Sequence, residues 1–305
     1  MFGYSNVGDR CLRVLRARGI DVPLVVTHRD HPGEAVWFTR VADTATDLGL
    51  RFVYGDDPLD PALRHAVAEA RPDVIFSFYY RSLLPGTILD LAPRGAFNMH
   101  GSLLPHYRGR APTNWAVLRG ERETGATLHE MVAKADAGRI VDQQAVPILP
   151  DDTGRQVFDK VTVAAEQVLW RSVPAIVAGE VRFLPNDVAA GSYFGRRTPE
   201  DGRIDWSRPA TRTYDLIRAV APPYPGAFTE IGGVALVIAA ARLGGDAPAA
   251  FTARQGLQVL DGRIVGVCGD GRMIEVRELR AAAERVGPDR LTELLAAHPA
   301  AGESP

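Results

Sequence analysis

The sequence has very little cysteine, the residue that builds disulfide frameworks and zinc–thiolate clusters. Its 305 residues include only two cysteines, Cys11 and Cys268, which stand far apart. Two thiols cannot make a zinc cluster, so we expect reduced, buried cysteines and no metal site. The chain also lacks an apolar run long enough to span a membrane, and its first residues are too few and too polar for a signal peptide. We therefore expect a cytoplasmic protein with no membrane partner.

Lysine is nearly absent as well. Lys134 and Lys160 are the only two, so arginine supplies almost all of the 35 basic residues, against 37 acidic ones and a net charge of −2. An RNA partner calls for a basic face that meets its phosphates. Acidic and basic residues also balance in the segment after residue 202. The charge pattern therefore argues against a nucleic-acid partner.

The glycine-rich turn of dinucleotide-binding proteins is missing too. Residues 3–8 read Gly-Tyr-Ser-Asn-Val-Gly, which lacks the GxGxxG pattern, so we expect no bound NAD. The length suffices for two domains. Strand and helix signals alternate over residues 1–185 and predict an α/β domain with crossover helices.

A change of composition predicts where this domain ends. Residues 186–208 are rich in Gly, Pro, Asp and Arg, which is typical of a linker. From 209 to 305, short β-rich runs alternate with glycine-containing turns, and this pattern predicts a small antiparallel barrel. Within the first domain, residues 35–48 and 153–177 are predicted helices. Pro174 lies inside the second helix and should end or kink it.

The residues with the clearest chemical role lie at the end of a predicted strand over 96–100. Asn98 and His100 are two positions apart, so on an extended strand both side chains point to the same face. A Gly-Ser-Leu-Leu-Pro turn follows at 101–105 and exposes the pair at the sheet edge. Asp136 stands in a loop bounded by Gly138, from which we expect it to fold back onto His100. His129 lies on another predicted strand, and we interpret it as structural.

This set of side chains suits the transfer of a one-carbon acyl group to an amine. An amine that attacks a formyl carbon creates a tetrahedral intermediate with a charged oxygen, which an amide N–H such as that of Asn98 stabilises by roughly 3 kcal/mol. A histidine takes the proton from the attacking nitrogen and returns one to the leaving nitrogen. A carboxylate beside it, here Asp136, favours the imidazolium and fixes the ring tautomer.

The surrounding residues resemble the folate-dependent formyltransferase family over nearly the whole chain. The similarity is carried by residues 97–112, by residues 124–129 and by the loop that ends in Asp136. It implies a Rossmann-like N-terminal domain, a smaller OB-like C-terminal β-barrel, and 10-formyltetrahydrofolate as the formyl donor. It also implies that Asn98, His100 and Asp136 are the catalytic residues.

Further site residues follow from this resemblance. The predicted cofactor-binding residues are Ser82, Leu83, Leu84, Arg110, Val132, Ala133, Lys134, Ala135 and Asp136. The sequence leaves open whether residues 82–84 line the pterin pocket or only close a turn between a strand and a helix. The candidate substrate residues are Tyr107, Arg196 and Arg197. Guanidinium groups suit phosphate oxygens, although adjacent arginines in a linker are more often solvated.

Within the family, residues 77–81, 100–112 and 194–199 are most similar to the formyltransferase domain of the bifunctional polymyxin-resistance proteins. That similarity implies UDP-4-amino-4-deoxy-L-arabinose as the acceptor, a part in lipid A modification and lipopolysaccharide biosynthesis, and a dehydrogenase activity on a separate polypeptide. The alternative is a methionyl-tRNA formyltransferase. Those proteins usually carry alanine where Gly101 stands and tryptophan where Tyr107 stands.

Three further alternatives share features with the chain. Glycinamide ribonucleotide formyltransferases and formyltetrahydrofolate hydrolases have the same three catalytic residues. The former are typically a single shorter domain, which the β-rich second part here speaks against. A folate-binding module without activity would not need all three of Asn98, His100 and Asp136.

Overall fold

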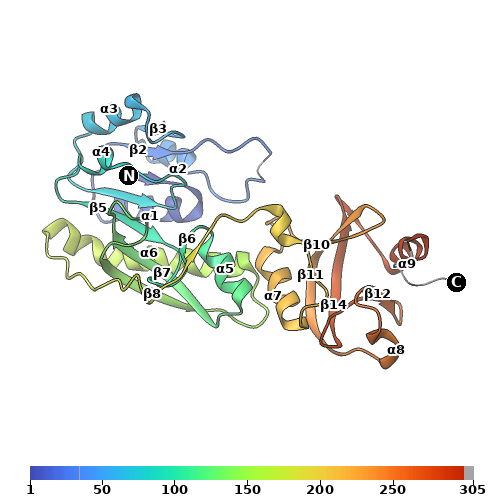
Figure 1. Cartoon of the computed structure of the whole chain (residues 1–305). Helices are drawn as coiled ribbons and strands as arrows, with labels where there is room; N and C mark the ends of the chain where they lie inside the picture. Colours follow the sequence, from blue (N-terminus) through green and yellow to red (C-terminus); the bar gives the residue numbers. More distant parts are fainter. Residues whose placement is uncertain (34, 299–305) are drawn as a thin grey trace. The chain divides into compact units, whose positions relative to one another are not determined.

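The computed structural model describes residues 1–33 and 35–298, which form two compact units (Figure 1). Unit 1 comprises residues 1–113, 123–147 and 158–196, and unit 2 comprises residues 114–122, 148–157 and the chain from residue 197 onward. This division differs from the predicted ranges of 1–185, 186–208 and 209–305. The expected linker is shared between the units, and residues 299–305 of the predicted second domain lie outside the described part.

Unit 1 is built on a sheet whose described strands have the order β3-β2-β1-β4-β5-β7-β8. The strands β1 to β5 run parallel, whereas β7 is antiparallel to β5 and to β8. Because β1 and β4 are neighbours at the centre of the sheet, the chain winds outward from there in both directions. The bounds are β1 Phe2–Gly3, β2 Val25–Thr27, β3 Phe52–Tyr54, β4 Ile75–Phe78, β5 Ala96–His100, β7 Glu123–Glu130 and β8 Ile140–Pro147.

Helices cover this sheet, as the predicted α/β class requires. Apolar side chains of α3 (Pro61–Glu69) and α4 (Gly86–Leu89) join those of β1, β2 and β4 in one buried cluster. Its members include Phe2, Val26, Leu63, Val67, Ile75 and Ile88. Unit 1 also contains α1 (Ser5–Ala17), α2 (Val41–Asp47) and most of α6 (Gly154–Ala178). The α/β class of the first domain is therefore confirmed.

The helix predicted over 35–48 is shorter in the structure, where α2 begins at Val41. The residues before it are held by contacts with other parts of unit 1. Trp37 packs against Phe158 with ring centroids 5.4 Å apart, and the N–H of Thr39 donates to Oδ1 of Asn6 at 2.8 Å. These tertiary contacts outweigh the modest helix propensity of the segment.

Helix α6 continues through Pro174 to Ala178, so of the two predicted outcomes an end at Pro174 is wrong. Proline lacks the N–H that would donate to the carbonyl of Trp170, four residues earlier. The guanidinium of Arg18 donates to that carbonyl through Nε at 2.9 Å and Nη2 at 2.6 Å, and it lies 3.8 Å from the centroid of the Trp170 ring. Arg18 thus supplies the hydrogen bond that the proline removes.

Unit 2 is β-rich, as expected. Its described strands form an antiparallel sheet with the order β10-β11-β14-β13-β12, and β15 pairs with β14. In place of a closed barrel the described sheet is a half-barrel. The bounds are β10 Ala227–Ile231, β11 Val234–Asp246, β12 Gly256–Leu260, β13 Arg263–Val267, β14 Arg272–Ala281 and β15 Glu284–Arg285.

The described helices of unit 2 include one from the segment around residues 114–122 and others that follow residue 197. They are α7 (Ala210–Val220), α8 (Ala249–Thr252), α9 (Pro288–Ala297), the 3₁₀ helix η1 (Pro199–Gly202) and most of α5 (Pro112–Arg119). Helix α7 lies against β11 and β14. No helix within residues 1–33 and 35–298 is both long enough and apolar enough to cross a membrane.

A short strand pair ties the first half of the predicted linker to unit 1. Strand β9 (Tyr193–Phe194) pairs in parallel with β6 (Arg108–Gly109), which lies in the turn that follows β5. The ring of Phe194 stacks on Tyr107 with centroids 5.0 Å apart. The segment 186–196 is therefore folded against the end of β5, where the candidate catalytic residues lie.

Candidate active site

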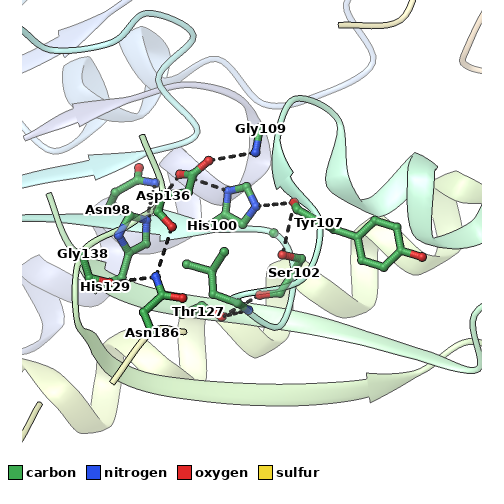
Figure 2. A network of polar contacts seen from close by, with 12 residues as sticks. Asn98, His100, Ser102, Tyr107, Gly109, Thr127, His129, Asp136, Gly138 and Asn186 are labelled. Atoms are coloured by element: carbon green, nitrogen blue, oxygen red, sulfur yellow. Dashed lines mark hydrogen bonds and ion pairs between the residues drawn. The ribbon is translucent and has the colours of Figure 1, made fainter. Parts of the chain in front are cut away.

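The three predicted catalytic residues come together at the carboxyl end of β5 (Figure 2). Asn98 and His100 lie on this strand, the first partly exposed and the second buried. Asp136 lies in the loop between β7 and β8. Its Oδ1 is 3.5 Å from Nδ1 of His100. The loop thus folds back onto β5, which is the arrangement that the sequence predicts.

Each ring nitrogen of His100 lies near an oxygen atom, Nε2 near the carbonyl of Tyr107 and Nδ1 near the carboxylate of Asp136. Nε2 lies 2.8 Å from the carbonyl oxygen of Tyr107, and a carbonyl can only accept, so Nε2 carries the hydrogen. In the neutral ring, Nδ1 then presents its lone pair to Asp136. The hydroxyl of Ser102 donates to the His106 carbonyl at 2.7 Å and holds the same turn. Transfer of the Nε2 proton requires that the contact with Tyr107 opens.

Burial decides the charge of His100. Only 6% of its surface is exposed, and this burial lowers its pKa; the charge of Arg108 acts in the same direction, while Asp136 opposes both. Burial also tends to raise the pKa of Asp136, but the two imidazoles and the N–H of Gly109 outweigh it and hold that pKa well below its usual range. At neutral pH the site therefore holds a carboxylate beside a neutral imidazole.

The carboxylate is fixed by groups that are remote in sequence. The N–H of Gly109 donates to Oδ2 of Asp136 at 2.9 Å. The amide of Asn186 donates to the carbonyls of Asp136 at 3.1 Å and of Gly138 at 2.9 Å, which clamps the loop (Figure 2). Asn186 is the first residue of the predicted linker. No sequence pattern marked it, because its partners are main-chain carbonyls.

The backbone around the site adopts unusual conformations. Tyr79, Tyr107, Ala111 and Asp136 all have positive φ, a region that side chains other than glycine rarely enter. Gly109 has φ 99°, and a Cβ there would come within 2.2 Å of the Phe194 carbonyl. Glycine is thus required for β6 to approach β9. Strained backbone of this kind gathers at functional sites.

His129 lies inside this network, although the sequence suggested only a structural role. Its Nε2 is 3.1 Å from Nδ2 of Asn98 and 3.6 Å from Oδ1 of Asp136. The signal that could have found it is strand register: β7 runs antiparallel to β5 and pairs His129 with Asn98. The neighbouring strand order was not known from the sequence.

The predicted cofactor-binding residues lie in two segments that face solvent in part. After β4, Leu83 has 72% of its surface exposed, Ser82 is half-buried and Leu84 is buried. In the loop before Asp136, Val132 has 42% of its surface exposed, Ala133 and Lys134 are exposed, and Ala135 is half-buried. Arg110 is exposed as well. Exposed apolar side chains such as Leu83 and Val132 suit a flat ligand that would cover them.

The candidate substrate residues fall into two groups. Tyr107 belongs to the turn that holds His100, and Arg196 is exposed at the end of unit 1. Arg197 belongs to unit 2, where its guanidinium lies 4.9 Å from the centroid of the Trp115 ring and donates to the Asp201 carbonyl at 3.0 Å. Burial lowers the pKa of Arg197. These contacts give Arg197 a packing role within its own unit.

The arrangement can stabilise an anionic oxygen through the Asn98 amide and can accept a proton at the His100–Asp136 pair. Among residues 1–33 and 35–298, no group of three or more His, Cys, Asp or Glu side chains is placed to hold a metal ion. The site offers proton transfer and charge stabilisation to a nucleophile that arrives with the substrate.

Comparisons with known proteins agree with this chemistry. The family model described as formyl transferase matches residues 3–173, and the model of the formyl transferase C-terminal domain matches residues 196–288.

Solved structures are similar in fold. An N-formyltransferase from Helicobacter canadensis, in complex with folinic acid and dTDP-3-aminofucose, has 20% identity and a TM-score of 0.70, over 90% of this chain and 97% of that one. WlaRD, a sugar 3N-formyltransferase with dTDP and 5-N-formyl-THF, has 20% identity and a TM-score of 0.68, over 93% and 97%. HypX from Aquifex aeolicus with tetrahydrofolic acid has 17% identity and a TM-score of 0.65, over 96% of this chain but 47% of that one.

Proposed function

The chain belongs to the formyl transferase family, and from this premise we propose that it transfers a formyl group from 10-formyltetrahydrofolate to the amine of a nucleotide-linked amino sugar. The observation that carries the proposal is the cluster of Asn98, His100 and Asp136 at the end of β5. The solved structures that resemble this chain in fold include sugar N-formyltransferases that bind a folate and a dTDP-sugar or dTDP.

The residues present suit a folate donor. Leu83 and Val132 expose apolar surface on the two segments that resemble the folate-binding segments of the family, and the carboxylate of Asp136 stands at the end of one of them. A pterin ring held against these side chains would remove that surface from water. Ser82, Leu84, Ala133, Lys134, Ala135 and Arg110 would complete this pocket.

In the proposed reaction the acceptor amine attacks the formyl carbon, a new C–N bond forms, and the bond to the donor nitrogen breaks. The Asn98 amide stabilises the charged oxygen of the intermediate by roughly 3 kcal/mol. The His100–Asp136 pair takes the proton that the amine loses and returns one to the leaving nitrogen. The amine is itself the nucleophile, so no covalent bond to the enzyme forms.

As the acceptor itself we propose UDP-4-amino-4-deoxy-L-arabinose, which would place the protein in lipid A modification and polymyxin resistance. The support is the similarity of residues 100–112 to the formyltransferase domain of the polymyxin-resistance proteins. Gly101 adds a physical reason against the methionyl-tRNA enzymes, which usually carry alanine there. A Cβ at Gly101 would come within 1.8 Å of the Tyr79 hydroxyl oxygen, so alanine at this position would require the Tyr79 side chain to move.

The test is a formylation assay with 10-formyltetrahydrofolate against a panel of acceptors. The panel contains UDP-4-amino-4-deoxy-L-arabinose, dTDP-linked 3-amino and 4-amino sugars, glycinamide ribonucleotide and charged initiator tRNA. We expect the UDP-amino sugar to be formylated fastest, and the His100→Asn and Asp136→Asn variants to be slower by at least about a hundredfold. Preference for a dTDP-linked amino sugar would correct the identity of the nucleotide and of the sugar, and would keep the proposed class of acceptor. If only charged initiator tRNA were formylated, the protein would be a methionyl-tRNA formyltransferase and the proposal would be rejected.

A further inference from the structure

We propose that His129 is a positioning residue which turns an N–H of the Asn98 amide toward the formyl oxygen of the donor. The inference rests on the proposed function, because it concerns the same site and the same intermediate. It gives a role to a buried histidine that the proposed reaction does not otherwise use.

The hydrogen on His129 can be assigned from its main-chain contact. Nδ1 lies 2.8 Å from the carbonyl oxygen of Glu130, the next residue. A carbonyl oxygen can only accept, so Nδ1 carries the hydrogen. In the neutral ring the lone pair is then on Nε2. This tautomer is the opposite of the one assigned to His100, whose hydrogen is on Nε2.

The lone pair on Nε2 in turn selects the orientation of Asn98. Nδ2 of Asn98 is 3.1 Å from Nε2 of His129, and an amide nitrogen donates while the amide oxygen only accepts. With the amide reversed, its oxygen would face the lone pair of Nε2, which is repulsive. With its lone pair on Nε2, His129 therefore holds one N–H of Asn98 and leaves the second N–H for another acceptor.

The strand pairing places the two side chains next to each other. Asn98 and His129 are directly opposite each other across the antiparallel pair β5 and β7, so their side chains are neighbours on one face. His129 is 2% exposed, so solvent does not compete for its Nε2. The orientation of the amide is thus fixed by the fold before the donor binds, as preorganised charge stabilisation requires.

Asp136 is the second group near Nε2 of His129, and its carboxylate also restricts which proton arrangement the site can hold. The same oxygen, Oδ1, lies 3.5 Å from His100 and 3.6 Å from His129 (Figure 2). Protonated His129 would donate from Nε2 and would need an acceptor there, either this oxygen or the amide oxygen of a reversed Asn98. The charged groups that face the ring are Asp136 from the β7–β8 loop and, when protonated, His100 from β5. Glu130 on β7 is engaged by Arg139.

The first test is spectroscopic and uses the unmodified protein. Long-range ¹H–¹⁵N spectra of histidine side chains distinguish the two neutral tautomers, and the His129→Gln variant identifies the His129 signals by their loss. We expect Nδ1–H for His129 and Nε2–H for His100 in the same spectrum at neutral pH. A His129 ring with its hydrogen on Nε2, or with both nitrogens protonated, would overturn the proposal.

The second test measures what the orientation contributes to the rate. We expect His129→Ala to lower kcat by about ten- to a hundredfold, with the KM for the donor changed by less than about threefold. His129→Gln keeps an acceptor near the position of Nε2 and should be at least about tenfold faster than His129→Ala. In an Asn98→Ala background, His129→Ala should lower kcat by less than about a further threefold, because the group that His129 orients is gone.

Equal losses of rate in both backgrounds would show that His129 acts independently of Asn98 and would reject the proposal. Should His129→Ala fail to fold, the His129→Gln rate and the tautomer spectrum decide. An absence of formyl transfer by the unmodified protein to every acceptor would reject the proposed function instead, and it would leave the tautomer result standing.

Discussion

His100 is a base whose environment opposes its charged form. Burial lowers its pKa from the ordinary value of 6.5, so the folded protein binds this proton only at lower pH than the unfolded chain does. Below about pH 6.5 the unfolded state therefore holds more protons, and the free energy of unfolding should fall as the pH is lowered. The pKa of Asp136 is depressed, so its contribution is lost only at much lower pH.

We expect His100→Asn to flatten the decline in unfolding free energy as the pH is lowered below about 6.5, measured by urea unfolding at a series of pH values. His28 is the necessary control, because burial lowers its pKa as well and it titrates in the same window. The variants His28→Asn and His100→Asn should each remove part of the pH dependence. A decline unchanged in His100→Asn would mean that His100 is not held neutral by burial.

At the scale of single residues, the sequence revealed what local spacing can encode. Asn98 and His100 share one strand, and Asp136 follows in a short glycine-bounded loop, so their meeting follows from a local pattern. Asn186 reaches Asp136 from 50 residues away and binds main-chain carbonyls, which any sequence offers. The role of His129 depends on the register between two strands. Neither could be read from a one-dimensional pattern.

At the scale of elements, α6 shows how a helix tolerates an internal proline. We expect Arg18→Met, which keeps the apolar stem but removes the donors, to lower the free energy of unfolding by about 1–2 kcal/mol. In a Pro174→Ala background the restored N–H can reach the Trp170 carbonyl, so the same change should cost less than about half as much. Urea unfolding of the four proteins in this cycle measures the coupling. If Arg18→Met lowered the free energy of unfolding equally in both backgrounds, Arg18 would not be replacing the hydrogen bond that Pro174 removes.

The strand predicted over 96–100 matches β5, whereas the segment 35–40 does not have its predicted structure. Buried runs such as β4 and β5 are recognisable because apolar side chains cover both faces of a central strand. Residues 35–40 have a helical pattern too, yet aromatic packing of Trp37 and Phe38 holds them in another conformation. The hydrogen bond that Pro174 removes from α6 is supplied by Arg18, the residue that follows α1. Such contacts are made only after the chain has folded.

At the scale of the whole molecule, several arginines of unit 2 are paired with neighbouring carboxylates. Ion pairs join Arg203 to Glu200 and Glu230, Arg208 to Asp205, Arg277 to Glu275, Arg280 to Glu278, and Arg290 to Glu293. A surface of this kind has little net field to attract phosphates. We therefore expect unit 2 to attract tRNA only weakly.

We expect initiator tRNA to bind only weakly in fluorescence anisotropy at low salt, and UDP to bind with little dependence on salt. A triple variant with Glu275, Glu278 and Glu293 each changed to Gln releases three arginines and should bind tRNA more tightly, with a steeper salt dependence. Tight and salt-sensitive binding of tRNA by the unmodified protein would favour the alternative acceptor.

The alternation of the two units along the chain has a consequence for how such a protein can diversify. Residues 114–122 and 148–157 belong to unit 2 although they lie between stretches of unit 1, and residues 186–196 belong to unit 1 although they follow α6. No single crossover in the gene can exchange unit 2 intact. A breakpoint at residue 185 would also separate Asn186 from the loop it clamps. We therefore expect new acceptor specificities to arise by point substitution, and functional chimeras to require junctions after residue 196.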